Sequence, residues 1–112
     1  MISFMNKITS IPQFETLKTQ EMGFVLYIND NMCSVGENVA PKLEKLMATA
    51  FPKMRLYQTL NSELPELSAQ LQVFVVPAVL VFFDGKLYIQ KNRSFSLTQL
   101  QQEIERYYKM VF

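Results

Sequence analysis

The sequence predicts an α/β fold in which helices flank a central mixed β-sheet and the chain ends with a β-hairpin and a helix. Apolar residues alternate along the chain between continuous runs, typical of buried strands, and stripes at helical spacing. Asp84-Gly85 separates two strand-like runs, and an Asp-Gly pair in that position is the strongest short-range signal for a hairpin. Two Ser-x-x-Gln patterns, at Ser10 and Ser96, mark the beginnings of helices.

A short strand, a helix and a buried strand are predicted for the first part of the chain. We expect a strand at the very start, followed by a helix that Ser10 and Gln13 begin as a capping box. Gly23 ends that helix. Residues 24–28, Phe-Val-Leu-Tyr-Ile, form a continuous β-branched and aromatic run, as in a strand that is buried on both faces.

A long helix, a strand and a short helix follow. Residues 34–50 carry one apolar stripe at helical spacing with charged residues opposite it, and Pro41 predicts a kink in this helix. The members of the stripe are Val35, Val39, Leu43, Leu46, Met47 and Ala50. A strand is expected over residues 53–60, and then a short helix that is capped by Asn61-Ser62 and extends through Leu71.

Two antiparallel strands and a last helix complete the prediction. The strands cover residues 78–83 and 86–90 on either side of the hairpin turn. Ser96 and Gln99 form the second capping box, which begins the last helix. The chain ends with an apolar group that packs on the sheet or, in the alternative interpretation, forms a patch for self-association. The group consists of Tyr107, Tyr108, Met110, Val111 and Phe112.

Length and composition indicate a single domain that spans residues 1–112. Of these 112 residues, 49% are apolar and 19% are charged, which suits one hydrophobic core. The net charge of +1 gives no field that would attract nucleic acid. No apolar run reaches membrane length, and residues 1–10 are too short and interrupted for a secretory signal. We therefore expect a cytoplasmic protein that binds neither nucleic acid nor membrane.

Cys33 is the only cysteine, and it lies where the predicted strand at residues 24–28 leads into the long helix. A helix N-terminus carries free N–H donors and partial positive charge, which favour a thiolate over a thiol. A single thiol forms no disulfide within its own chain, and one unpaired cysteine is typical of a reducing compartment. The alternative is a small buried hydrophobe, since free cysteines are among the most buried residues.

Over roughly residues 8 to 110 this arrangement resembles the thioredoxin family. Cys33 stands where the family keeps its attacking cysteine, and Pro41 follows eight residues later, where the family's helix is kinked. Val76-Pro77 matches the family's cis-proline step, and Asp84-Gly85 its hairpin turn. The resemblance implies a thioredoxin-like fold with Cys33 as the catalytic residue. It also implies a surface that holds an extended substrate, formed by Met32, Ser34, Gly36, Val76 and Pro77.

The chain departs from the family at the positions that complete its chemistry. The family's second cysteine corresponds to Gly36, so a mixed disulfide on Cys33 must be resolved by another molecule. The family's buried acid corresponds to Tyr27, and a phenol with a pKa of ~10 is a poor base at neutral pH. Asp30 lies three residues before the thiol and opposes its ionisation. The chain has no histidine to act as a base or metal ligand. No metal or other cofactor is expected, nor is ordinary dithiol reductase activity.

Two functions of different class follow. The first is a thiol-disulfide redox protein in cell redox homeostasis, in which Cys33 forms mixed disulfides with protein or low-molecular-weight thiols. The second is a non-catalytic module that binds a protein or peptide in the groove beside Met32, Val76 and Pro77. A disulfide between the Cys33 residues of two chains is a third interpretation, supported by the odd cysteine alone. Whether the chain is an enzyme, and its oligomeric state, stay open at this level.

Overall fold

The computed structural model describes residues 6–30, 34–92 and 95–112, with the backbone alone for residues 34–38. Its elements follow the predicted order. The strands are β1 (Asn6–Lys7), β2 (Gly23–Asn29), β3 (Arg55–Leu60), β4 (Ala78–Phe83) and β5 (Lys86–Asn92). The helices are α1 (Ile11–Gln20), α2 (Ser34–Ala50), α3 (Pro65–Gln70) and α4 (Leu97–Val111).

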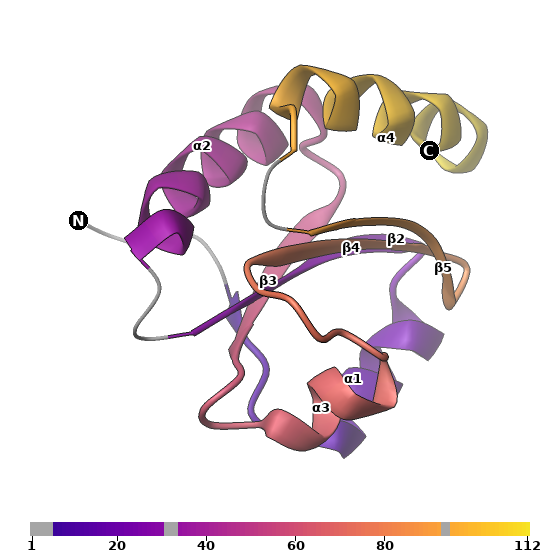
Figure 1. Ribbon diagram of the computed structural model, residues 1–112. Coiled ribbons are helices and arrows are strands. Elements are labelled where there is room, and N and C mark those ends of the chain that lie inside the picture. The colour runs from indigo at the N-terminus through magenta and orange to yellow at the C-terminus, as the bar shows by residue number, and fades with distance from the viewer. Residues whose placement is uncertain (1–5, 31–33, 93–94) are drawn as a thin grey trace.

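The five described strands form one mixed sheet in the order β1-β3-β2-β4-β5. β1, β3 and β2 are parallel, whereas β4 is antiparallel to both of its neighbours. Helices α2 and α4 cover one face of the sheet, and α1 and α3 cover the other (Figure 1). The predicted α/β class, with a mixed sheet and a C-terminal hairpin and helix, is confirmed. No helix in the described ranges is both long and apolar enough to cross a membrane.

The core consists of two apolar clusters separated by the sheet. Because side chains alternate along a strand, Val25 and Tyr27 of β2 face α2 and α4, while Phe24, Leu26 and Ile28 face α1 and α3. All five are at most 1% exposed. This arrangement explains the continuous apolar run in the sequence, because a central strand with helices on both faces has no solvent side.

The predicted stripe of α2 packs on the sheet wherever its side chains are described. Leu43 and Met47 are buried, and the other members lie against them in the same cluster, namely Val39, Leu46 and Ala50. Pro41 lies inside the helix as predicted. The side chain of Val35 belongs to the part of α2 for which the backbone alone is described.

Serine side chains cap the two helices for which capping was predicted. Ser10 Oγ accepts a hydrogen bond from the Gln13 N–H at 3.3 Å, and Ser96 Oγ accepts one from the Gln99 N–H at 3.2 Å. The Gln13 side chain does not return this bond to Ser10; its Oε1 accepts instead from the Thr9 N–H at 2.9 Å. Half of the first capping box is therefore confirmed, and its second half is displaced by one residue.

Four of the predicted boundaries are wrong. α1 ends at Gln20, and Gly23 is the first residue of β2 rather than the end of the helix. β5 extends to Asn92 rather than to Gln90.

Asn61 and Ser62 lie in a turn and do not cap α3, whose N-cap is Leu64 with no side-chain hydrogen bond. Pro65 follows, and it suits a first helical position because it has no N–H to satisfy and a fixed φ. β3 begins at Arg55 rather than at Lys53. The error at Asn61 and Ser62 arises because polar turn residues and helix caps have similar compositions.

The C-terminal apolar group packs on the sheet, with one exception. Tyr107, Tyr108, Val111 and Phe112 lie against the cluster beneath α2 and α4. Met110 is 82% exposed, so the predicted packing is wrong for this residue. The spacing explains the difference, because the four packed residues lie on one side of the helix and Met110 does not.

Replacing Thr59 by valine is expected to stabilise the protein. Thr59 lies in β3, is 1% exposed, and its Oγ1 has no hydrogen-bond partner among the described residues. A buried hydroxyl without a partner costs free energy, and valine keeps the β-branched shape without that group. We expect the free energy of unfolding of Thr59→Val in urea to rise by about 1 kcal/mol. The control is Thr49→Val, because the exposed Thr49 hydroxyl donates to the Lys45 carbonyl at 2.8 Å. A loss of stability in Thr59→Val, or an equal gain in both, contradicts this account.

Candidate functional site

The candidate site lies at the edge of the sheet where β2 ends and β4 begins. Ala78, the first residue of β4, pairs with Ile28 of β2. Pro77 precedes Ala78 in the chain and Asn29 follows Ile28, so both lie at this edge. The chain passes from β2 to the first residue of α2, Ser34, through only four residues, 30–33. The register of the sheet therefore brings Pro77 to the edge from which α2 begins (Figure 1).

Two of the predicted site residues, Met32 and Cys33, lie outside the described residues. Ser34 and Gly36 fall in the first turn of α2, for which the backbone is described. Cys33 therefore directly precedes the first residue of a helix of 17 residues. The backbone N–H groups of such a first turn have no partners within the helix, and the helix dipole adds partial positive charge.

The peptide bond between Val76 and Pro77 is cis, as the resemblance implies. Val76 is partly buried and packs against the cluster beneath α1 and α3. The segment before it is tied to the neighbouring hairpin, because the Asn92 side chain donates a hydrogen bond from Nδ2 to the Val75 carbonyl at 3.4 Å. β5 thus helps to position the loop that carries Pro77.

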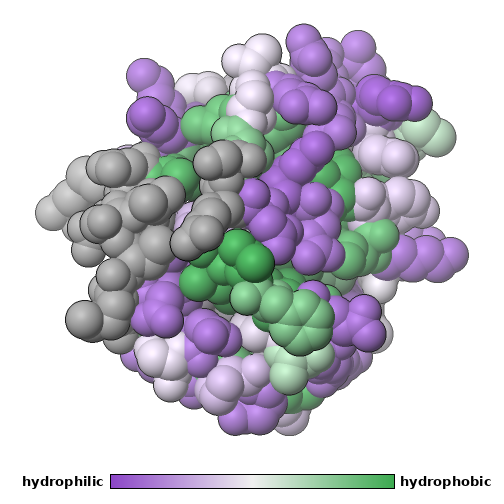
Figure 2. Space-filling view, viewed as in Figure 1, coloured by the Kyte–Doolittle hydropathy of each residue, from purple (hydrophilic) through white to green (hydrophobic). Residues whose placement is uncertain are grey.

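Two apolar side chains beside this proline are exposed, which was not predicted from the sequence. Phe74 is 84% exposed and Val75 is 41% exposed. Gln72 has a φ of 58°, and the Val73 N–H donates to the Ser68 carbonyl at 2.8 Å, so the chain turns after α3 and buries Val73 before it reaches Phe74. An apolar area occupies the position of this loop in Figure 2. The available signal was the apolar run at residues 73–76 in a loop, where solvent exposure normally selects polar residues.

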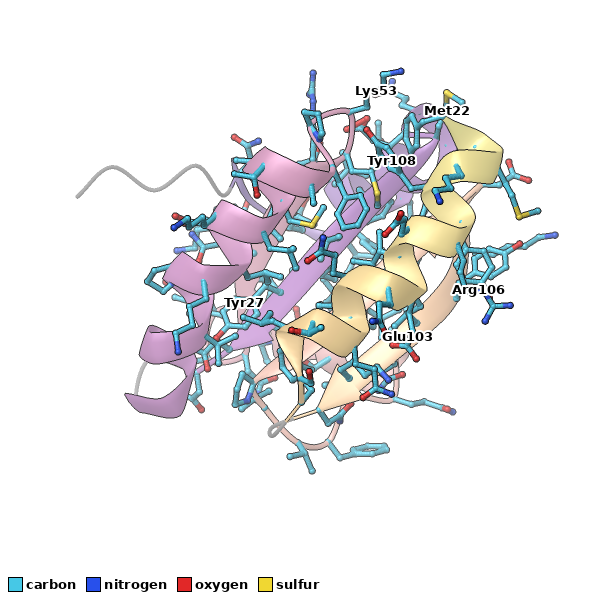
Figure 3. The ribbon with its side chains drawn as sticks, turned by 90° about the horizontal axis from the view of Figure 1, so that it is seen from above. Met22, Tyr27, Lys53, Glu103, Arg106 and Tyr108 are labelled. Atoms are coloured by element: carbon cyan, nitrogen blue, oxygen red, sulfur yellow. The ribbon has the colours of Figure 1, made fainter. Side chains whose placement is uncertain are left out.

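Tyr27 lies where the resemblance places a buried acid. It is 1% exposed and belongs to the cluster between the sheet and helices α2 and α4 (Figure 3). Asn29 follows two residues later on the same face of β2, and its Oδ1 is buried without a hydrogen-bond partner among the described residues. At the C-terminal end of β2 this face therefore carries a phenol and a carboxamide, neither of which is a base at neutral pH.

The described residues with shifted pKa values lie far from this edge. Burial, followed by the hydrogen bond from the Tyr57 hydroxyl to Glu21, raises the pKa of Tyr57. The pKa of Arg55 is raised by its hydrogen bond with Tyr57 and by the charge of Glu21. Arg55 pairs with Phe24 at the opposite end of β2 from Asn29. These shifts reflect a structural contact and not a second candidate site.

Metal chemistry has no support in the described part of the chain. Nowhere in residues 6–30, 34–92 and 95–112 do three or more metal-ligating side chains gather in a group that could hold an ion. What the site offers is a helix N-terminus, the backbone of Val76 beside a cis proline, and the exposed side chains of Phe74 and Val75. This combination suits the binding of an extended chain next to a thiol.

No protein-family model matches the chain. It is similar to the thioredoxin-like protein YdfQ of Bacillus subtilis (strain 168), with 28% identity over 106 residues. The similar region covers 95% of this chain and 91% of that protein, so the likeness extends over almost the whole of both.

Three solved structures show the same fold. Mitochondrial thioredoxin 3 of Saccharomyces cerevisiae, in its oxidised form, matches with a TM-score of 0.83 and 24% identity, over 91% of this chain and 94% of that one. Thioredoxin of Trypanosoma brucei brucei matches with a TM-score of 0.84 and 17% identity, over 94% and 91%. A chain from a study of thiol resolution in yeast mitochondrial 1-Cys peroxiredoxin via glutathione/thioredoxin systems matches with a TM-score of 0.84 and 23% identity, over 94% and 99%. The thioredoxin-like fold predicted from the sequence is confirmed.

Proposed function

We propose that this chain, which has a thioredoxin-like fold and a single cysteine, carries out thiol-disulfide exchange through Cys33 alone and depends on another molecule to complete each cycle. The observation that carries this proposal is the position of Cys33. It directly precedes a helix of 17 residues that begins at the same sheet edge as the cis Val76–Pro77 bond. Two of the similar solved structures are thioredoxins, and the similar protein of Bacillus subtilis is a thioredoxin-like protein, which agrees with a redox role.

The chemistry proceeds in two exchanges. The Cys33 thiolate attacks one sulfur of a disulfide R–S–S–R′, forms the mixed disulfide with R–S, and releases R′–S⁻. A thiolate from a second molecule then attacks the R–S sulfur or the Cys33 sulfur. Attack on R–S releases the Cys33 thiolate and restores the starting state. Attack on the Cys33 sulfur releases R–S⁻ and leaves Cys33 in a disulfide with the second molecule, which a further thiolate must attack to free Cys33. The helix N-terminus supports both steps, because its partial positive charge stabilises Cys33 as attacking and as leaving thiolate.

Resolution within the chain lacks both of the groups it needs. Gly36, in the first turn of α2, has no side chain to supply a second thiol. A buried carboxylic acid can transfer a proton near neutral pH, but the residue buried beneath α2 is Tyr27, and a phenol, with an ordinary pKa of ~10, does not serve in this role. A thiol from a partner protein or from a low-molecular-weight compound must therefore finish the cycle.

The rate of Cys33 alkylation against pH tests the first step. We expect a midpoint below the ~8.5 of a free thiol, because the first turn of α2 stabilises the thiolate. Incubation with oxidised glutathione is expected to give a mixed disulfide that is visible in the intact mass and reversed by reduced glutathione. Cys33→Ser is the control that forms no adduct. A midpoint at or above that of a free thiol, together with no adduct on the wild-type chain, contradicts the redox function.

Phe74 and Val75 favour a second candidate function on the same surface. Two exposed apolar side chains beside a cis proline form a docking surface that needs no thiol. If the chain is a non-catalytic binding module, Cys33→Ser binds a partner as tightly as the wild-type chain. If exchange is the function, Cys33→Ser no longer captures the partner, because the mixed disulfide cannot form.

A further inference from the structure

A second surface lies at the end of the sheet away from Pro77, where β5 and the last turns of α4 meet. β5 is outermost in the strand order, and β4 is its one strand partner in the described part of the chain. Its outer edge therefore presents a row of backbone N–H and C=O groups that no described strand pairs with. Where no bulge interrupts it, such an edge is a template for an additional strand.

A β-bulge turns Tyr88 onto the face of the sheet that α4 covers. Leu87 pairs with Phe82 and Ile89 pairs with Val81, so Tyr88 is an extra residue in β5. Its ring lies 4.9 Å from that of Tyr107 of α4 and 6.0 Å from that of Phe83. The bulge thus joins the edge strand and the helix into one aromatic surface, and Tyr88 still has 47% of its area exposed.

The side chain of Met110, which is 82% exposed, extends this surface along α4. Leu87 pairs with Phe82 and therefore lies on the other face of the sheet. On α4, a hollow of about 440 Å³ is lined by Gln102, Glu105, Arg106, Tyr107, Lys109 and Met110. We call Lys86, Tyr88, Arg106, Tyr107 and Met110 the β5–α4 surface.

The unmatched charges of the β5–α4 surface are positive. Both nearby glutamates of α4 already have partners: Glu103 pairs with Lys91 at 2.9 Å, and Glu105 pairs with Lys109 at 3.2 Å. Lys86 and Arg106 form no ion pair with any residue in the described ranges. Arg106 points away from the body of the molecule, whereas Glu103 lies between α4 and β5 (Figure 3).

We propose that the β5–α4 surface binds an extended segment of a partner protein that adds a strand to β5 and carries both acidic and apolar side chains. The open edge supplies backbone hydrogen bonds, the aromatic surface accepts the apolar side chains, and Lys86 and Arg106 attract the acidic ones. This site is separate from Cys33 and does not depend on the proposed redox function.

Two other occupants fit these observations less well. A second copy of the chain, related by a two-fold axis, would place the same unpaired cations opposite one another. An anionic lipid surface would match the cations and aromatic rings but would make no use of the open backbone edge. Titration of the chain with peptide, with vesicles and with increasing protein concentration distinguishes these two occupants from the proposed one.

The test follows backbone amide resonances of the full, reduced chain during titration with an alternating peptide, Glu-Leu-Glu-Phe-Asp-Val. We expect shifts in residues 86–89 and 106–110 at peptide concentrations up to about 1 mM. A peptide with lysine in place of each acidic residue is expected to cause none. Lys86→Glu combined with Arg106→Glu is expected to weaken binding about tenfold or more.

Two further variants keep the result interpretable. Lys42→Glu combined with Lys45→Glu makes the same change of charge on exposed positions of α2 and should leave binding unchanged. Met110→Glu, at a position that is 82% exposed, weakens binding without disturbing the core. The proposal is overturned if the acidic peptide changes no amide chemical shifts, or if the changes centre on residues 74–77. It is also overturned if the double variant at Lys86 and Arg106 binds the peptide as tightly as the double variant at Lys42 and Lys45. Two further outcomes overturn it. If the amide resonances of residues 86–89 move only with protein concentration, the occupant is a second copy of the chain; if they move only with vesicles containing phosphatidylglycerol, it is an anionic lipid surface.

Discussion

Replacing Gly36 by cysteine is expected to give the chain an internal disulfide and a measurable dithiol reductase activity. Gly36 lies in the first turn of α2, three residues after Cys33. Residues three apart at a helix start lie on the same side of the first turn, so a small adjustment of the backbone before Ser34 brings their Cβ atoms to the separation of a disulfide. The second thiol would resolve the mixed disulfide on Cys33 within the same molecule. The helix does not oppose the change, because glycine is disfavoured in a helix by about 1 kcal/mol relative to alanine.

The measurements are the number of free thiols after oxidation and the reduction of insulin disulfides with dithiothreitol as the electron source. Ala48→Cys is the matched control, since it places a second cysteine at an exposed position of the same helix, 15 residues from Cys33. We expect turnover in Gly36→Cys to remain modest, because Tyr27 supplies no acid beneath the site. If Gly36→Cys forms no internal disulfide and gains no activity over the control, the assignment of Cys33 and Gly36 to the family's two cysteine positions is wrong.

Replacing Phe74 by serine is expected to slow mixed-disulfide formation with an apolar peptide disulfide about tenfold. Burying one aromatic ring contributes about 1.5–3 kcal/mol, and part of that gain is available when a peptide covers a side chain that is 84% exposed. The rate with oxidised glutathione should not change, because this small polar disulfide has no apolar side chain to place on Phe74. Both rates are read from the intact mass of the protein over time.

Met22→Ser is the control for this experiment. Met22 is 56% exposed, and it directly precedes β2, at the opposite end of that strand from Pro77. It should alter neither rate. An equal loss of rate with both disulfides in Phe74→Ser would indicate a disturbed loop, and an unchanged rate with the peptide would remove Phe74 from the substrate surface.

The sequence predicted the fold well because strong local signals agreed with one another. Two serine caps, the Asp84-Gly85 turn and the buried run at residues 24–28 each fix a boundary or a face. The errors fell where local chemistry is ambiguous. Asn61 and Ser62 have the composition of a cap but lie in a turn, and the apolar ending of the chain did not reveal that Met110 faces solvent.

Less of the site was predictable, because it depends on contacts between distant segments. The sequence indicated the Val76–Pro77 step, but the exposure of Phe74 and Val75 follows from the turn at Gln72 and the burial of Val73. The hydrogen bond from the Asn92 side chain to the Val75 carbonyl joins residues 17 apart in the sequence, so no local sequence pattern predicts it. Likewise, the bulge that directs Tyr88 toward Tyr107 depends on the pairing of β4 with β5 rather than on either strand alone.

β5 connects the two surfaces of this protein. Its last residue, Asn92, donates a hydrogen bond to the loop at Val75, and two residues near its start, Lys86 and Tyr88, belong to the β5–α4 surface. Seven residues of strand extend about 20 Å. A partner whose acidic segment lies along β5, and whose disulfide follows at that spacing, would engage both surfaces at once. The second contact would then form within one complex, at an effective concentration in the millimolar range. The length of β5 would therefore favour partners in which an acidic segment and a disulfide lie about 20 Å apart, over partners that have only one of the two.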